Sequence, residues 1–429
     1  MVAHAPRAAT RRWRWEELGL LSLAIAGGVA AGLPGAARPG GGIAIGGLGP
    51  VLALAAMAFA VHVSLVWRCP RAEQRILPCV VLLMGLGLAL NQRVAPALAT
   101  RQWAWLIVGL VVLAAATHLP YELRLIQRYR YSWAILGIAL VGVTLVAGRS
   151  AIPGGPRLWL GGGGLTFQPS EVLRLVLVFF MAGYLEDKRE ILTEASLKLG
   201  PVRLMPWPYL IPMAAMMGLS LALLTAQRDL GAGLLLFVIG LAMLYLVSGR
   251  PTYVAGGLAL FAGSAWLLHH EIAVVQTRVA IWLDPWADPA GTGYQLLQGL
   301  MAIAEGGILG AGIGQGLPTL IPAVHTDFIY AALVEEVGLA GAGAVLAVYA
   351  ALFLAGFRVA IHASTPFRQM LAAGLTLGLS VQTLIILGGV LRLIPLTGIT
   401  LPFFSHGGTS IVTSAAAMGL VLRISGEDR

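Results

Sequence analysis

Long apolar runs dominate the chain and alternate with short polar connections. Twelve of these runs, each of roughly 15 to 25 residues, fit helices that cross a hydrocarbon core of about 30 Å. Their approximate ranges are 18–35, 43–67, 76–91, 103–118, 132–148, 171–185, 209–226, 231–248, 253–268, 328–356, 369–391 and 410–424. A helix satisfies its own backbone hydrogen bonds in lipid. The pattern therefore predicts an all-α, polytopic membrane protein with about twelve transmembrane helices.

Composition supports this prediction. Of the 429 residues, 58% are hydrophobic and 11% are charged, whereas an average soluble domain carries about 25% charged residues. The net charge of +9 does not indicate nucleic-acid binding, because topology explains basic residues near membrane helices. Cys69 and Cys79 are too few for a disulfide framework or a zinc site. The first apolar run is followed by further runs, so no cleavable signal peptide is expected.

The positions of the cations predict the orientation of the helices. With the N-terminus inside, 19 Lys and Arg residues fall in inner connections and 8 in outer ones. This asymmetry predicts that both termini are cytoplasmic. The longest connection, about 269–327, then lies outside, and long structured loops are usually functional. Its semi-apolar, glycine-rich composition suggests that parts of it dip back into the membrane.

Two adjacent carboxylates, Glu335 and Glu336, lie inside the tenth run, about two helical turns after Phe328. Ionisable groups inside apolar runs are costly and therefore informative. Neighbouring residues on a helix diverge by about 100°, so the two side chains are not expected to face one partner. Either one of them reaches the outer interface, or one lines a water-filled cavity.

A polar stretch, QPSEVLR, opens the sixth run at residues 168–174. Ser170 is predicted to cap the helix, which would place Glu171 at the positive end of the helix dipole. Glu171 and Arg174 are three residues apart and so face each other on a helix. A cap with an ion pair explains the stretch structurally, and a polar pair in a substrate cavity is the alternative.

Two arginines, Arg157 and Arg228, are predicted to lie in outer connections. Arg228 belongs to a very short turn, in which Asp229 follows it. An arginine at headgroup level can hold a lipid phosphate through a charge-assisted hydrogen bond. A solvated turn explains both arginines equally well, so both interpretations stay open.

The large outer loop contains the sequence DPWADP, in which Asp284 and Asp288 each precede a proline. Proline keeps the residue before it out of the α region, so each aspartate should lie at a bend. Asp-Pro is also common in ordinary turns, so catalysis and turn formation are both possible roles. His325 and Asp327 are two potential metal ligands, too few for a dedicated site. The residues thus indicate an outward-facing acidic site near arginines, suited to an anionic, lipid-borne substrate.

Five stretches, in the same order, resemble the SEDS family (shape, elongation, division and sporulation), to which RodA and FtsW belong. They are 168–171 (QPSE), 227–231 (QRDLG), 288–295 (DPAGTGYQ), 322–328 (PAVHTDF) with 335–338 (EEVG), and 395–410 (PLTGITLPFFSHGGTS). The resemblance covers roughly residues 76–425. Since the family usually has ten spans, it implies a polymerase core at 76–425. Residues 1–75 would then be a basic N-terminal segment with two additional transmembrane helices.

The resemblance implies an inverting peptidoglycan glycosyltransferase that polymerises lipid II into glycan strands on the outer face of the cytoplasmic membrane. The growing strand would be the donor and would leave undecaprenyl diphosphate, while the sugar 4-hydroxyl of an incoming lipid II would be the acceptor. Asp288 matches the family's essential loop aspartate and would be the general base. Glu171 and Arg174 match its cavity pair. Arg157 and Arg228 would neutralise the diphosphate.

Further expectations follow from the same resemblance. The remaining predicted substrate-binding residues are His325, Asp327, Glu335 and Ser405. No protein-held metal is expected, although a divalent cation such as Mg²⁺ or Mn²⁺ could accompany the diphosphate. The expected protein partner is a class B penicillin-binding protein, a transpeptidase, because the chain shows no soluble domain for cross-linking peptides.

The chain departs from the family pattern at several positions. Arg174 stands where Lys is more frequent, which keeps the charge but changes its geometry. Arg228 stands where Pro is frequent, and His406 where Tyr is frequent. These departures leave open whether the chain serves elongation, division or sporulation. Two alternative functions also stay open: a lipid II flippase, and a non-catalytic scaffold of the elongation or division machinery.

Overall fold

The structure of the protein is a computed structural model that describes residues 14–36, 45–120, 123–150, 155–162, 165–190, 197–199, 202–204 and 207–427. Most of the basic N-terminal segment, including Arg7, Arg11 and Arg12, lies outside the described residues.

Twelve long helices coincide with the twelve predicted runs, so the predicted fold class is confirmed. They are α1 (Trp15–Ala36), α2 (Ile45–Arg68), α3 (Ile76–Val94), α4 (Pro96–Thr117), α6 (Arg130–Ala147), α7 (Pro169–Asp187), α9 (Trp207–Ala226), α10 (Leu230–Ser248), α11 (Pro251–Glu271), α14 (Ile329–His362), α15 (Pro366–Val390) and α16 (Gly408–Ser425). Eleven of them are long and apolar enough to cross a membrane. The twelfth, α7, is more polar because it carries the candidate residues Glu171 and Arg174 and two acids in its last turn.

Shorter elements fill the connections. They are α5 (Arg124–Arg128), α12 (Ala273–Leu283), α13 (Tyr294–Gly306), the 3-10 turns η1 (Pro285–Ala287) and η2 (Pro318–Leu320), and the strands β1 (Leu160–Gly162), β2 (Leu165–Phe167), β3 (Leu197–Leu199) and β4 (Val202–Leu204). The strands pair as two antiparallel hairpins, with Leu160 opposite Phe167 in the first and Leu197 opposite Leu204 in the second. The long connection at about 269–327 contains α12, η1, α13 and η2 and is largely helical.

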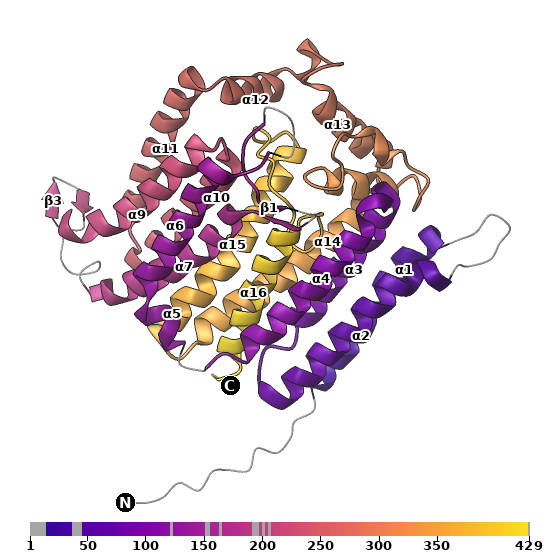
Figure 1. The fold of residues 1–429 in the computed structure, drawn as a ribbon, viewed down its shortest axis with the longest axis horizontal. Helices are drawn as coiled ribbons and strands as arrows, with labels where there is room; N and C mark the ends of the chain where they lie inside the picture. Colours follow the sequence, from indigo (N-terminus) through magenta and orange to yellow (C-terminus); the bar gives the residue numbers. More distant parts are fainter. Residues whose placement is uncertain are drawn as a thin grey trace, which may run out of the picture.

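The segments that connect the long helices lie at the two ends of the bundle (Figure 1). Helices α12 and α13 lie at one end, while α5 and the end of α16 lie at the other. This arrangement agrees with the prediction that the long loop and the C-terminus are on opposite sides. Helices α1 and α2 pack along one side of the bundle, beside α3 and α4.

The centre of the bundle is formed by α3, α7, α15 and α16, which bury most of their side chains. By contrast, α11 buries little of its surface. Since lipid covers apolar side chains as well as protein does, an exposed apolar helix is stable in a membrane. Polar side chains are costly there, and the central helices α7, α15 and α16 bury several of them, including Arg174, Gln382 and Thr413.

Helix α14 is broken at Gly338, whose φ of 69° is in the left-handed region. The glycine-rich loop 307–312 lies against the break. Four backbone hydrogen bonds of 2.9–3.1 Å join this loop to residues 335–340. Irregular backbone at membrane depth is tolerated where protein satisfies its polar groups, and this loop meets that condition. The large connection is thereby fixed to the start of α14.

Candidate active site

The predicted pair at the start of α7 forms an ion pair. Arg174 Nη2 lies 2.9 Å from Glu171 Oε2, and the side chains are 9% and 14% exposed. The spacing of three residues brings them to one face of the helix, as the sequence indicated. Both charges are held largely inside the protein, where an ion pair needs further hydrogen bonds to offset desolvation.

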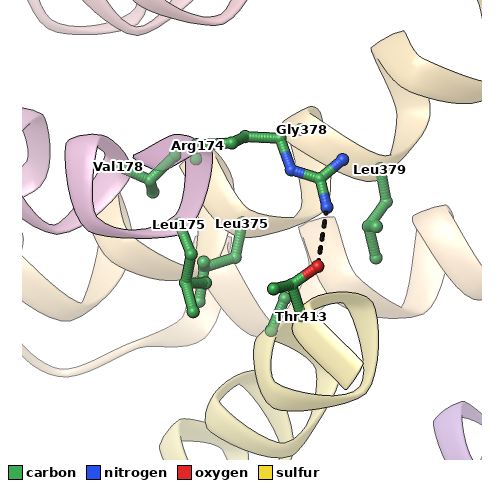
Figure 2. A pocket seen from close by; sticks show the side chains of 9 residues that line it. Arg174, Leu175, Val178, Leu375, Gly378, Leu379 and Thr413 are labelled. Carbon is green, nitrogen blue, oxygen red and sulfur yellow. Dashed lines mark hydrogen bonds between the residues drawn. The ribbon is translucent and has the colours of Figure 1, made fainter. Parts of the chain in front are cut away.

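Two helices supply those further hydrogen bonds. Arg174 Nη1 donates to Oε1 of Gln382 on α15, and Nη2 donates to Oγ1 of Thr413 on α16 at 3.4 Å. Thr413 Oγ1 also donates to Glu171 Oε2 at 3.3 Å. Figure 2 shows Arg174 and Thr413 meeting across a small pocket whose other walls are apolar, including Leu175 and Leu379. The pair is thus a hydrogen-bonded unit built from three central helices.

Ser170 does not cap α7, so that prediction was wrong. The helix begins at Pro169 with Gln168 as the residue before it. Ser170 Oγ instead donates to Oδ2 of Asp229 at 2.9 Å, and Gln168 Nε2 donates to the same oxygen at 3.2 Å. Asp229 also caps α10 by accepting from the backbone N–H of Ala232 at 3.2 Å. A buried aspartate therefore joins the starts of α7 and α10.

A half-buried arginine, Arg278, lies near the carboxylates of Asp229 and Asp327. Arg278, on α12, donates from Nη1 to the carbonyl of Thr397 at 3.2 Å. Burial lowers the pKa of its guanidinium, while the nearby charges of Asp229 and Asp327 act in the opposite direction. Burial also raises the pKa of both carboxyl groups from their ordinary values. Asp229, Asp327 and Arg278 thus place two carboxyl groups and one guanidinium near one another, each partly shielded from water.

The loop between α15 and α16 docks onto the segment that precedes α14. Ser405 Oγ donates to the carbonyl of Thr326, and the N–H of His406 donates to the carbonyl of His325 at 2.8 Å. The imidazoles of His325 and His406 lie 5.8 Å apart at their centroids. Burial, followed by the charges of His325 and Arg101, lowers the pKa of His406 to about 4. The His406 ring is therefore neutral at pH 7, and burial also lowers the pKa of His325 from its ordinary value. Ser405 is buried in the contact between the two loops.

Glu335 and Glu336 face different partners, as their spacing on a helix predicted. Glu335 Oε1 accepts from the N–H of Leu317 at 2.6 Å, and Glu336 Oε2 lies 2.5 Å from Nη2 of Arg93. The carboxylates are 5% and 2% exposed, so neither reaches the outer interface. Together they fasten loop 307–317 and α3 to the start of α14.

Asp284 and Asp288 flank the turn η1, which confirms that each lies at a bend. Asp284 Oδ1 accepts from the N–H of Trp286 at 3.1 Å. Asp288 Oδ2 accepts from both the N–H and the hydroxyl of Thr292, at 2.7 and 3.0 Å. These two hydrogen bonds lower the pKa of the exposed Asp288 carboxyl from its ordinary value. The carboxylate is therefore charged at neutral pH and held in a fixed direction through one oxygen.

Arg157 and Arg228 are both exposed, and each lies in a connection between long helices. Arg228 has a φ of 61°, and this left-handed turn leaves Arg228 outside while Asp229 points inward. Of the predicted site residues, Glu171 and Arg174 meet on α7. His325 and Ser405 lie in the contact between the α15–α16 loop and the segment before α14. The hydrogen bonds of Asp288 come from its own loop.

The residues that the structure adds to the site are Asp229, Arg278, Gln382 and Thr413. Three of them carried a signal in the sequence, because they are polar residues within or at the edge of apolar runs. Their partners are far away along the chain, so a single sequence could not pair them. Among the described residues, no group of three or more His, Cys, Asp or Glu side chains could hold a metal ion.

The fold and the site define a multi-pass membrane protein with a set of buried charges among its central helices. The chain belongs to the FtsW, RodA and SpoVE family of cell cycle proteins, whose family model matches residues 75–429. The resemblance noted in the sequence is thereby confirmed. Helices α1 and α2 precede the matched region.

Individual relatives carry names of the same kind. The peptidoglycan glycosyltransferase RodA of Mycobacterium bovis is 36% identical over 376 residues, which cover 85% of this chain and 80% of the relative. An FtsW relative from Geobacter metallireducens is 32% identical and covers 76% of this chain and 84% of its own length. A solved peptidoglycan synthase complex, described as coordinating polymerization and crosslinking, has a matching chain of 27% identity. It covers 82% of this chain and 97% of its own, with a TM-score of 0.69.

Proposed function

We propose that this protein is a peptidoglycan glycosyltransferase that polymerises lipid II into glycan strands on the outer face of the cytoplasmic membrane. Membership of the family and the names of the relatives support the activity. The observation that carries the mechanism is the charged, fixed carboxylate of Asp288 in the large loop. Asp288 follows η1, in the connection between α12 and α13, and these two helices lie at one end of the bundle (Figure 1).

In the proposed reaction, Asp288 accepts the proton of the acceptor sugar's 4-hydroxyl as that oxygen attacks the anomeric carbon. The new C–O bond forms as the bond to the diphosphate breaks, with inversion at the carbon. Thr292 occupies Asp288 Oδ2, which leaves Oδ1 to receive the proton. The lowered pKa makes the Asp288 carboxylate a weaker base in the free protein. Bound substrate would exclude water and raise this pKa again, because burial disfavours the charged form.

The diphosphate leaves with its negative charge, which cationic groups must neutralise. We assign this role to Arg157 and Arg228, which are exposed on the outer connections, and assign the cavity pair Glu171 and Arg174 to the bound substrate. His325 and Asp327 would contribute to the surrounding surface, while the buried Glu335 and Ser405 would hold the loops around it in place. A divalent cation such as Mg²⁺ or Mn²⁺ would take most of its ligands from the diphosphate and water, as Mg²⁺ commonly does.

A class B penicillin-binding protein is the proposed partner, since a polymerase needs a transpeptidase to cross-link its strands. The matched solved complex joins polymerization to crosslinking, which supports this assignment. We also propose that both termini are cytoplasmic, because the outer connections hold 8 cations and the inner ones 19.

Synthesis of glycan strands from lipid II by the purified protein in detergent tests the activity, because a detergent micelle has no second leaflet. A polymerase makes strands under these conditions. A flippase makes none but moves lipid II across the bilayer of proteoliposomes. A scaffold does neither, and either of those outcomes would contradict the proposal.

A further inference from the structure

Gln382 lies in the middle of α15 and is completely buried. Both ends of its amide are used. Oε1 accepts a hydrogen bond from Arg174 Nη1, while Nε2 donates to the carbonyl of Thr400 at 2.8 Å and to Ser410 Oγ at 3.4 Å. Removing this side chain would leave its buried partners without hydrogen bonds, which is costly.

The contacts of Arg174 divide between the two arms of its guanidinium. Nη2 lies near Glu171 Oε2 and donates to Thr413, whereas Nη1 donates to Gln382. A guanidinium is planar, so partners on two nitrogens fix its plane as well as its position. A lysine ammonium has no plane to fix. The hydrogen bond from Arg174 to Gln382 therefore fixes an orientation that only arginine at position 174 has.

Thr400 belongs to the loop between α15 and α16. The same loop docks onto the segment before α14 through Ser405 and His406. Gln382 thus lies between the charged pair of α7 and a loop at the outer end of the bundle. An amide suits this place, because a single side chain must accept from a cation and donate to a carbonyl.

We propose that Gln382 is a positioning residue of the polymerase. It holds the Arg174 guanidinium in the orientation that faces Glu171 and the pocket, and it couples that orientation to the α15–α16 loop. The proposal rests on the proposed function, in which Arg174 contacts the bound substrate. Gln382 itself acts through Arg174 and Thr400 rather than by touching substrate.

The test measures initial rates of lipid II polymerisation for Gln382→Met, which keeps the volume and removes both hydrogen-bonding ends. Loss of a hydrogen bond to a charged group should lower kcat about 10- to 100-fold. The matched control is Gln369→Met on the same helix, where Nε2 donates to a backbone carbonyl at 3.0 Å. This control should stay within about 3-fold of the wild type.

The deciding measurement is the same substitution in an Arg174→Lys background. Lysine has a single ammonium nitrogen and so lacks the separate Nη1 that donates to Gln382. There Gln382→Met should cost less than about 3-fold, so the two changes combine non-additively. If Gln382→Met lowers the rate by the same factor in both backgrounds, Gln382 acts independently of Arg174 and the proposal is wrong.

A second variant covers the case in which Gln382→Met unfolds at a lower temperature than the wild type. Gln382→Glu keeps an acceptor for Arg174 but loses the donor to Thr400 and competes with Glu171. Measured at a temperature at which it is folded, it should lose at least about 10-fold in rate, and full activity of this variant would overturn the proposal. Wild-type protein in the same assay separates the two claims, since an inactive wild type refutes the proposed function itself.

Discussion

Replacing Arg93 by methionine should destabilise the protein strongly, because Arg93 connects three helices. At the end of α3, its Nη2 lies 2.5 Å from Oε2 of Glu336 on α14. Its Nη1 donates to the carbonyl of Ala31 on α1 at 2.8 Å and to the carbonyl of Ala89 at 3.1 Å. Arg93→Met removes the cation and leaves the Glu336 carboxylate, which is 2% exposed, without its charge partner.

The expected loss follows from that burial. Removing one partner of a buried ion pair costs about 3–5 kcal/mol, because the remaining charge stays desolvated. The entropy of unfolding is about 2 cal/mol/K per residue, so for a chain of 429 residues 1 kcal/mol corresponds to about 1 °C in Tm. Thermal unfolding in detergent, followed by tryptophan fluorescence, should therefore show a Tm about 3–5 °C lower than that of the wild type.

The chain provides a matched control in the pair Arg75 and Glu16, which also joins α1 to the rest of the protein. Their contact is 3.2 Å, and the side chains are 47% and 54% exposed. An exposed pair contributes about 0–1 kcal/mol, so Arg75→Met should lower Tm by about 1 °C or less. Adding Glu336→Gln to Arg93→Met should restore most of the loss, because position 336 then no longer carries a buried charge without its partner. Equal shifts for Arg93→Met and Arg75→Met, or no recovery in the double variant, would refute this reasoning.

Three further predictions concern topology, partner and pH. In intact cells expressing a variant without Cys69 and Cys79, Ala290→Cys should react with an impermeant thiol reagent, whereas labelling of Glu190→Cys instead would invert the orientation. Purification from native membranes in mild detergent should retain a transpeptidase of the penicillin-binding class, and polymerisation that is unchanged by adding that partner would argue against obligate activation. The pKa of His406 is about 4 in the folded protein against an ordinary 6.5, so the unfolded chain binds the proton more tightly. Its contribution to stability is complete above pH 6.5 and is lost as the pH falls towards 4. His406→Gln should flatten the dependence of Tm on pH in that window, and an unchanged pH profile would contradict it.

The sequence predicted the helices and the local geometry within them well. Each apolar run became a helix, because length and hydrophobicity suffice to define a spanning segment. The pairing of Glu171 with Arg174 and the divergence of Glu335 from Glu336 followed from the period of the α-helix alone.

Contacts between distant segments could not be predicted in the same way. Gln382 and Arg174 are 208 residues apart, and Ser170 and Asp229 are 59 residues apart. In the turn between α9 and α10, the sequence drew attention to Arg228, but the left-handed backbone turns its neighbour Asp229 inward. The break at Gly338 was equally hidden, because glycine occurs 55 times in the chain and most of these glycines do not break a helix.

The most direct test of the catalytic assignment is the polymerisation rate of Asp288→Asn compared with Asp284→Asn, measured with purified protein and lipid II. Both aspartates precede a proline and both accept hydrogen bonds from their own turn. A general base contributes about 10²–10⁴-fold, so Asp288→Asn should nearly abolish strand synthesis. Its Tm should hardly change, because Asn keeps the shape of the side chain and an acceptor for Thr292. Asp284→Asn should lose far less activity. Normal rates in Asp288→Asn, or an essential Asp284 beside a dispensable Asp288, would contradict the account.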